Sequence, residues 1–247
     1  MSSGNVAGIL LAAGEGSRLG RPKALIELGG QSLVRRGIAL LRDGGANPVI
    51  VVTGATGPLS TGADSTGSDS TSADSTRADS TSADSTRADS ARADSARADS
   101  TGPDGRVVSV TGVHNPDWRA GMGSSLAIGL AAVPAECSAA VFALADQPLV
   151  GPQAVRRLIA AHAAGASAAV ACYDGRPRNP VLIGREHFPE VIELAVGDVG
   201  ARPFLHAHKD LVTEVECGDT GRPDDIDTPD DLARIEALLA GTTSFPT

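Results

Sequence analysis

The chain has 247 residues, of which 41% are hydrophobic and 2% aromatic, and its net charge of −9 argues against a protein that binds nucleic acid. It contains no apolar run of roughly 18 residues and lacks the basic start of a signal peptide, so we expect no membrane partner. The three cysteines, Cys137, Cys172 and Cys217, have no CxxC spacing, which indicates neither a disulfide framework nor a zinc site and favours a cytoplasmic location.

An apolar run at residues 6–13 predicts a buried first strand, and a glycine-rich loop follows it in LAAGEGSRLGRPK, residues 11–23. Such a loop exposes backbone N–H groups that can face a phosphate. Arg18 adds a planar fork of donors and Lys23 a compact positive charge, two geometries that proteins use on polyphosphates. We therefore interpret the loop as a binding site for a triphosphate.

A dinucleotide-binding turn is the main alternative, because Gly14, Gly16 and Gly20 have the spacing GxGxxxG. That motif requires a helix directly after the glycines and an acidic residue about 20 positions further on, at the end of the second strand. Pro22 interrupts such a helix, and the second strand, predicted at residues 48–53, is followed by Gly-Ala-Thr without a carboxylate. A nicotinamide site is therefore disfavoured but stays open.

A helix is predicted at residues 33–42, ending at two glycines, and a degenerate repeat of ADSTR type fills residues 57–104 after the second strand. The repeat has almost no side chain that could bury apolar area, so it cannot offset the entropy of ordering. We predict a disordered insert in a single domain at residues 1–247, and removal of residues 57–103 is expected to change stability and activity little.

Strands and helices alternate in the rest of the chain. Strands are predicted at residues 107–113, 139–144, 168–173 and 212–215, and helices at residues 124–132, 152–164 and 229–239. This alternation predicts a mainly parallel sheet that is covered by helices on both faces. Ligands bind such sheets at the carboxyl ends of the strands.

Asp146 comes almost directly after the strand predicted at residues 139–144, so it should emerge at the ligand-binding edge of the sheet. Mg²⁺ commonly takes one or two protein carboxylates together with phosphate oxygens and water, and Asp146 has the placement for such a ligand. An Asx-turn before Pro148 accounts for this aspartate equally well.

A second acidic cluster, DDIDTPDD, spans residues 224–231. Its second half has the chemistry of a helix start, with Thr228 as the N-cap, a proline next and two acids at the positive end of the helix dipole. Asp225 and Asp227 remain unexplained, and Asp227, which adjoins the cap, is the better candidate for a second metal contact.

Another glycine-bearing turn leads into a helix at GMGSSL, residues 121–126. The N–H groups and hydroxyls of Gly123, Ser124 and Ser125 could hold a base or ribose. Two serines that cap a helix explain the same pattern at least as well.

Six motifs in this order resemble the MobA-like nucleotidyltransferase family, most closely its molybdenum cofactor cytidylyltransferase branch. They are LAAGEGSRLGRPK (11–23), NPDWRAGMGSSL (115–126), LADQPLV (144–150), GRPRNPVL (175–182), GDVGARPFL (197–205) and DIDTPDDL (225–232). The resemblance covers nearly all of the chain outside the repeat. It implies a Rossmann-like three-layer α/β/α sandwich with a mainly parallel sheet, of the type of nucleotide-diphospho-sugar transferases.

The resemblance also implies an activity, in which a nucleoside monophosphate moves from a triphosphate, CMP from CTP, to a phosphorylated acceptor such as molybdopterin cofactor, and pyrophosphate leaves. Lys23 would stabilise charge on the α-phosphate. A molybdenum enzyme or its chaperone is an implied partner. The implied site comprises base and ribose contacts at Leu11, Ala12, Ala13 and Gly14, phosphate contacts at Arg18 and Lys23, and Mg²⁺ ligands at Asp146 and Asp227.

Two features of the sequence bear on the substrates. Guanylyl-transferring relatives usually have LAGG where Ala13 stands here in LAAG, and the extra methyl group would narrow the pocket against a purine. Arg178-Asn179 stands where relatives commonly have Gly-His or Gly-Asn before Pro180. The resemblance implies that this segment faces the acceptor, so the identity of the acceptor stays open.

Two other functions are weighed against nucleotidyl transfer. The segments GRPRNPV and GDVGARPF also resemble proteins of the nicotine blue oxidoreductase type, which implies an NAD(P)H-dependent reductase as the alternative. The missing ribose carboxylate argues against it. A catalytically idle nucleotide-binding module is a third possibility, which intact Lys23, Asp146 and Asp227 disfavour.

Overall fold

The computed structural model describes residues 4–58, 96–102 and 105–242, in which an eight-stranded sheet has the order β10-β8-β9-β7-β1-β4-β6-β5. Strands β1, β4, β6 and β7 pair in parallel, as do β8 and β10. Only β9 and the edge strand β5 run antiparallel to their neighbours within this sheet, which confirms the prediction of a mainly parallel sheet. The strands are β1 (Asn5–Ala12), β4 (Val49–Thr53), β5 (Ala96–Thr101), β6 (Val107–His114), β7 (Cys137–Leu144), β8 (Ala168–Tyr173), β9 (Arg176–Gly184) and β10 (Val212–Glu216).

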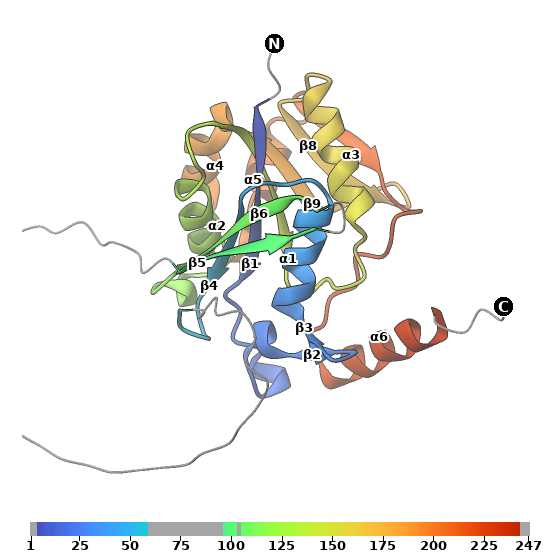
Figure 1. Cartoon of the computed structure of the whole chain (residues 1–247). Helices are drawn as coiled ribbons and strands as arrows, with labels where there is room; N and C mark the ends of the chain where they lie inside the picture. The colour runs from blue at the N-terminus through green and yellow to red at the C-terminus, as the bar shows by residue number, and fades with distance from the viewer. Residues whose placement is uncertain (1–3, 59–95, 103–104, 243–247) are drawn as a thin grey trace, which may run out of the picture.

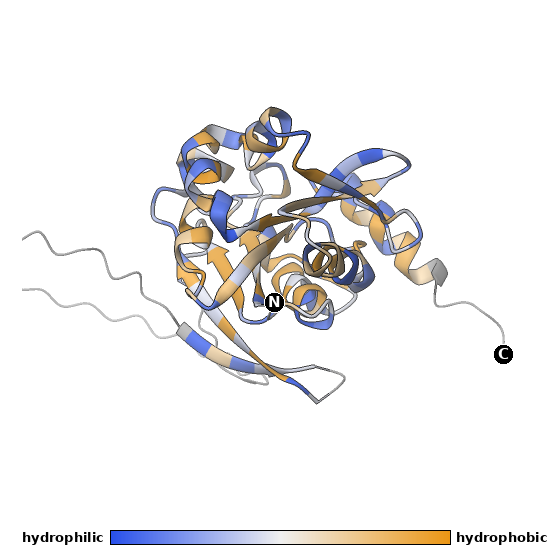
Figure 2. Cartoon of the chain, turned by 90° about the horizontal axis from the view of Figure 1, so that it is seen from above, coloured by the Kyte–Doolittle hydropathy of each residue, from blue (hydrophilic) through white to orange (hydrophobic). Residues whose placement is uncertain are grey.

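Helices cover both faces of this sheet (Figure 1). On one face α1 (Leu33–Asp43) and α3 (Pro152–Ala163) contribute to an apolar cluster that includes alternate residues of β1, such as Leu10. On the other face α2 (Met122–Ala131), α4 (Phe188–Leu194) and α5 (Arg202–Ala207) contribute to a second apolar cluster, which includes the intervening residues of β1, such as Ile9. Figure 2 shows hydrophobic strands at the centre of the molecule. Because each face buries its own apolar cluster, the three-layer architecture implied by the sequence is confirmed.

A third, smaller apolar cluster joins the two ends of the described chain. It consists of Ile26, Leu28 and Leu33, around the hairpin of β2 (Glu27–Leu28) and β3 (Gln31–Ser32), together with Ile226 and Ile235. The last residue belongs to α6 (Pro229–Thr242), which lies beside the hairpin in Figure 1. This packing brings the segment before α6 close to the loop that follows β1.

The start of α6 is capped as the sequence predicts. The backbone N–H of Asp231 donates to the hydroxyl of Thr228 (3.2 Å), and one Asp231 carboxylate oxygen accepts from the backbone N–H and hydroxyl of Thr228. At 14 residues α6 is the longest helix of the described segments, and no helix in them combines the length and apolar character needed to cross a membrane.

The prediction of a disordered insert at residues 57–104 is wrong at its C-terminal end, because Ala96–Thr101 form β5 against β6. An edge strand gains ladder hydrogen bonds from one side and needs no long apolar run. Here Ser100 accepts from the Arg42 guanidinium (2.8 Å), and Arg97 donates to Ser109 (2.8 Å). Residues 59–95 and 103–104 lie outside the described residues. A deletion that runs to residue 103 would remove β5, so the expectation that it is neutral no longer holds.

Replacement of Leu10 by alanine tests the core between β1 and α1. This side chain is fully buried, and it packs so closely against Gly37 of α1 that a methyl group there would overlap it. We expect the free energy of unfolding to fall by about 2–5 kcal/mol, because a cavity replaces the lost side chain. Leu25→Ala is the matched control, since that side chain is 50% exposed and its loss should cost less than about 0.5 kcal/mol. Urea titration of both variants measures the difference, and equal losses would contradict the assignment of the core.

Candidate functional site

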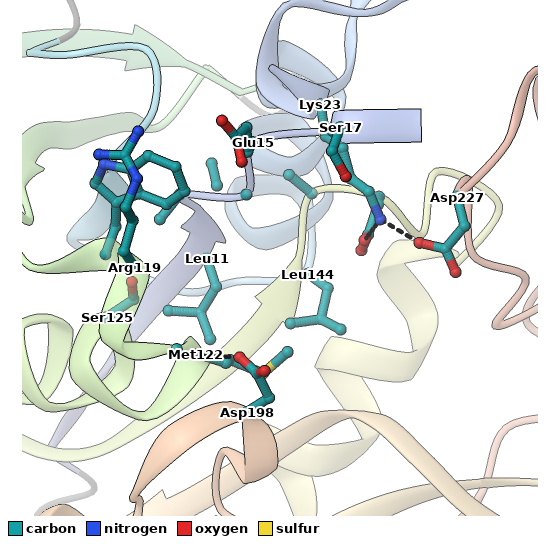
Figure 3. A pocket seen from close by; sticks show the side chains of 18 of the residues that line it. Leu11, Glu15, Ser17, Lys23, Arg119, Met122, Ser125, Leu144, Asp198 and Asp227 are labelled. Atoms are coloured by element: carbon teal, nitrogen blue, oxygen red, sulfur yellow. Dashed lines mark hydrogen bonds and ion pairs between the residues drawn. The ribbon is translucent and has the colours of Figure 1, made fainter. Parts of the chain in front are cut away.

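A cavity of about 730 Å³ opens where β1 and β7 end, between the loop after β1 and the first turn of α2 (Figure 3). Its position at the carboxyl ends of parallel strands is the one expected for a ligand site. The lining residues are Leu11, Ala12, Ala13, Gly14, Glu15, Gly16, Ser17, Arg18, Lys23, Trp118, Arg119, Gly121, Met122, Ser125, Leu144, Ala145, Asp146, Asp198 and Asp227.

Lys23 connects two acidic segments that are far apart in the sequence. Its ammonium donates to Asp146 Oδ2 at 2.8 Å and to Asp227 Oδ1, and Figure 3 marks the contact with Asp227. The side chains of Lys23 and Asp146 are 19% and 20% exposed, and that of Asp227 is 51% exposed. The backbone N–H of Ile226 donates to the Asp146 carbonyl (2.9 Å), which holds the second acidic segment beside the first.

Around Lys23 the site contains more carboxylates than positively charged groups. Burial lowers the pKa of Lys23, but the carboxylates of Asp146 and Asp227 outweigh it and hold that pKa above its usual 10.5. Partial desolvation raises the pKa of Asp225, which accepts a hydrogen bond from Gln147 (2.9 Å), and the charges of Asp146 and Asp227 raise it further. The ammonium therefore contacts two carboxylates and lies near a third, so another positive charge would be stabilised there.

The donor set fits a hard divalent cation, because carboxylate oxygens are the ligands that Mg²⁺ prefers. Within the described part of the chain, no group of three or more His, Cys, Asp and Glu side chains is arranged to hold a metal by itself. A cation at Asp146 and Asp227 would thus need additional oxygens. Phosphate groups of a ligand in the same cavity would supply them.

The loop after β1 owes its shape to Gly16. This residue has φ +63°, and a Cβ atom on it would overlap the carbonyl oxygen of Arg21, so the chain can turn back here only with glycine. The turn brings both Arg18 and Lys23 to the cavity. Arg21 is exposed and does not line it.

The opposite wall is the N-terminal turn of α2. The backbone N–H of Met122 donates to Asp198 (3.2 Å), as Figure 3 shows, and Ser125 lines the cavity. Gly123 and Ser124, which the sequence predicts as nucleotide contacts, do not line it. Gly123 packs against the carbonyl of Ala195, where a Cβ atom would overlap. The Ser124 hydroxyl donates to the backbone carbonyls of Gly121 and Asp117. Both residues build the wall rather than face the cavity.

Several lining residues were not predicted from the sequence, among them Glu15, Trp118, Arg119 and Asp198. The Arg119 guanidinium lies 4.3 Å from the centre of the Trp118 ring, a cation–π arrangement that offers a flat surface to a planar group. Trp118 is the one tryptophan of a chain that is 2% aromatic, which is the signal that could have identified it.

The chain is similar to known proteins in both sequence and fold. The profile of the MobA-like NTP transferase domain matches residues 8–74 and 87–212. The nicotine blue oxidoreductase of Paenarthrobacter nicotinovorans is 33% identical over 237 residues, 93% of this chain and 96% of that protein. A probable molybdenum cofactor guanylyltransferase of Opitutus terrae is 47% identical over 47 residues, which are 19% of this chain and 23% of that protein.

A solved structure shows the same architecture. The crystal structure of Rv0371c from Mycobacterium tuberculosis has 25% sequence identity and a TM-score of 0.64, and the similarity covers 96% of this chain and 100% of that one.

Proposed function

This chain belongs to the MobA-like NTP transferase family, and on that basis we propose that it transfers a nucleoside monophosphate from a nucleoside triphosphate to an anionic acceptor. The observation that carries the proposal is the convergence of Lys23, Asp146 and Asp227 at one cavity. These residues come from three separate segments, and together they provide a cation for phosphate oxygens and two carboxylates for a metal.

In the proposed reaction, an oxygen of the acceptor forms a bond to the α-phosphorus while the bond to the α–β bridging oxygen breaks. The electron pair of that bond leaves with pyrophosphate. Arg18 and Lys23 would hold the triphosphate and stabilise the charge that builds up on it, so that positioning and electrostatics supply the catalysis. A divalent cation, Mg²⁺ in our proposal, would be held by Asp146 and Asp227 and would neutralise phosphate charge when bound.

We further propose CTP as the donor, because Ala13 lines the cavity where guanylyl-transferring relatives usually have glycine. Ala13→Gly removes one methyl group and should lower the ratio of CTP to GTP turnover by about tenfold, the usual size of a discrimination by one methyl group. Initial rates of pyrophosphate release with each nucleotide measure this ratio. An unchanged ratio would show that Ala13 does not select the base.

We propose a phosphorylated acceptor of the molybdopterin cofactor type, and a molybdenum enzyme or its chaperone as the recipient of the product. The similarity to a probable molybdenum cofactor guanylyltransferase supports this choice. The three cysteines are free and buried, which suits the reducing cytoplasm in which we place the reaction.

A reductase that uses NAD(P)H is the competing function, since one relative carries the name nicotine blue oxidoreductase. A dinucleotide site would need a carboxylate for the ribose after β4, and the described turn there has none that lines the cavity. Strand β4 ends at the buried Thr53, which is followed by Gly54, and no acidic residue of this turn lines the cavity.

A thermal-shift screen distinguishes the two functions. A ligand that binds only the native state raises the melting temperature. At a concentration of 100 times its Kd, it increases the free energy of unfolding by about 2.7 kcal/mol. We expect CTP to raise it only when Mg²⁺ is present, and NADH and NADPH to leave it unchanged. Stabilisation by a reduced nicotinamide without metal, and none by any triphosphate, would replace the transferase with the reductase.

A further inference from the structure

A second cavity, of about 1150 Å³, lies next to the first and shares Leu144 with it. Strands β8, β9 and β10 and helix α5 contribute its walls. Part of this lining is apolar and comes from both the sheet and the helix layer, as Val170, Val181, Leu205 and Val212 show. A ligand seated here would lie beside whatever occupies the first cavity.

The charged residues of this cavity are mostly positive and lack acidic partners. Arg178, Arg202 and Lys209 line it, and within the described ranges none of the three has a carboxylate at ion-pair distance. Two carboxylates, of Glu214 and Asp225, share the lining. The first cavity has the opposite balance, because its lining contains four acidic residues and three basic ones.

A local irregularity of the sheet places part of this lining. Strands β8 and β9 pair Val170 with Val181, but the next residue of β8 pairs with Arg178, so that Asn179 and Pro180 form a bulge in β9. A bulge of this kind changes the direction of the side chains around it. Arg178 and Asn179 both line the cavity as a result.

We propose that this cavity binds the acceptor, and that the acceptor is a small molecule with an apolar body and an oxyanion that Arg178, Arg202 and Lys209 hold. Guanidinium groups bind phosphate and carboxylate through two donors at once, and the apolar lining would cover the rest of the molecule. The inference rests on the proposed function, which puts the α-phosphate in the first cavity, across the shared wall at Leu144.

The test uses 1-naphthyl phosphate as a probe with these two features and 1-naphthol as its uncharged counterpart. Calorimetric titration of the full-length chain should detect the phosphate and give at least tenfold weaker binding for the naphthol, which lacks the charge-assisted hydrogen bonds. Arg202→Gln and Lys209→Gln should each weaken the binding of 1-naphthyl phosphate by about tenfold. Arg35→Gln removes an exposed arginine of α1 that does not line either cavity, and it should leave the affinity unchanged.

Saturation with CTP and Mg²⁺ decides which cavity holds the probe. Continued binding of 1-naphthyl phosphate under these conditions, and in Lys23→Met, supports the second cavity. Loss of binding on addition of CTP, equal affinity in all the variants, or no binding at all would overturn the inference. If the probe binds as expected while no triphosphate does, the proposed function fails but the anion site remains.

Discussion

Asp146→Asn is expected to lower the rate of nucleotide-dependent pyrophosphate release by about 10²–10³-fold while the fold stays intact. The amide has nearly the shape of the carboxylate but carries no charge, so it is a poor ligand for a hard cation. The Asp146 backbone carbonyl that accepts from Ile226 is unaffected by the change, so the second acidic segment should keep its place. The melting temperature and the circular dichroism spectrum provide the check on folding.

Asp219→Asn is the matched control for this variant. Asp219 is 67% exposed and pairs with Arg157 at 2.6 Å, away from both cavities. An exposed ion pair of this kind contributes about 0–1 kcal/mol, so neither stability nor turnover should change much. If Asp146→Asn released pyrophosphate at the rate of the unaltered chain, Asp146 would have no part in the mechanism.

Lys23→Met should reduce pyrophosphate release to a similar degree, by about 10²–10³-fold, for a different reason. Methionine retains the apolar stem but removes the ammonium, so Asp146 and Asp227 lose the cation that lies between them. The variant also loses a positive charge that would face the α-phosphate. Triphosphate affinity should fall along with turnover, because Lys23 would serve both binding and catalysis.

Two further variants test whether the loss in Lys23→Met comes from this ammonium group or from the charge of the loop as a whole. Arg21→Gln removes a charge from the same loop at a residue that does not line the cavity, and its turnover should stay near that of the unaltered chain. Lys23→Arg keeps the charge but spreads it over a planar group, so we expect only partial recovery. Equal losses in Arg21→Gln and Lys23→Met would indicate a general effect of loop charge instead of a role for Lys23.

The parallel strands and the larger helices could be predicted because short, buried runs such as those of β1 and β7 carry their signal locally. Strand β9 was missed, since its first residues, Arg176–Asn179, are polar and contain a proline, and only pairing with β8 makes them part of a strand. Strand β5 was missed for a related reason, because its stability comes from β6 and not from its own composition.

The proximity of some candidate residues could be predicted where the topology of a parallel sheet determines it. Residues that follow β1 and β7 must meet at one edge, so a meeting of Lys23 and Asp146 could be expected. Close packing could not be foreseen in the same way. Gly123 looks like part of a binding loop, yet glycine is needed there because a Cβ atom would overlap the carbonyl oxygen of Ala195. That contact depends on how two helices far apart in the sequence pack together.

The distance along the chain between Lys23 and Asp227, 204 residues, has a consequence during synthesis on the ribosome. The basic half of the site leaves the ribosome early, whereas Asp227 and the helix α6 that packs beside it are among the last described residues to emerge. A nascent chain that has completed the central strands therefore lacks the second carboxylate. On the proposed mechanism such a chain would not yet transfer nucleotide, and transfer would begin only after translation of the segment that carries Asp227.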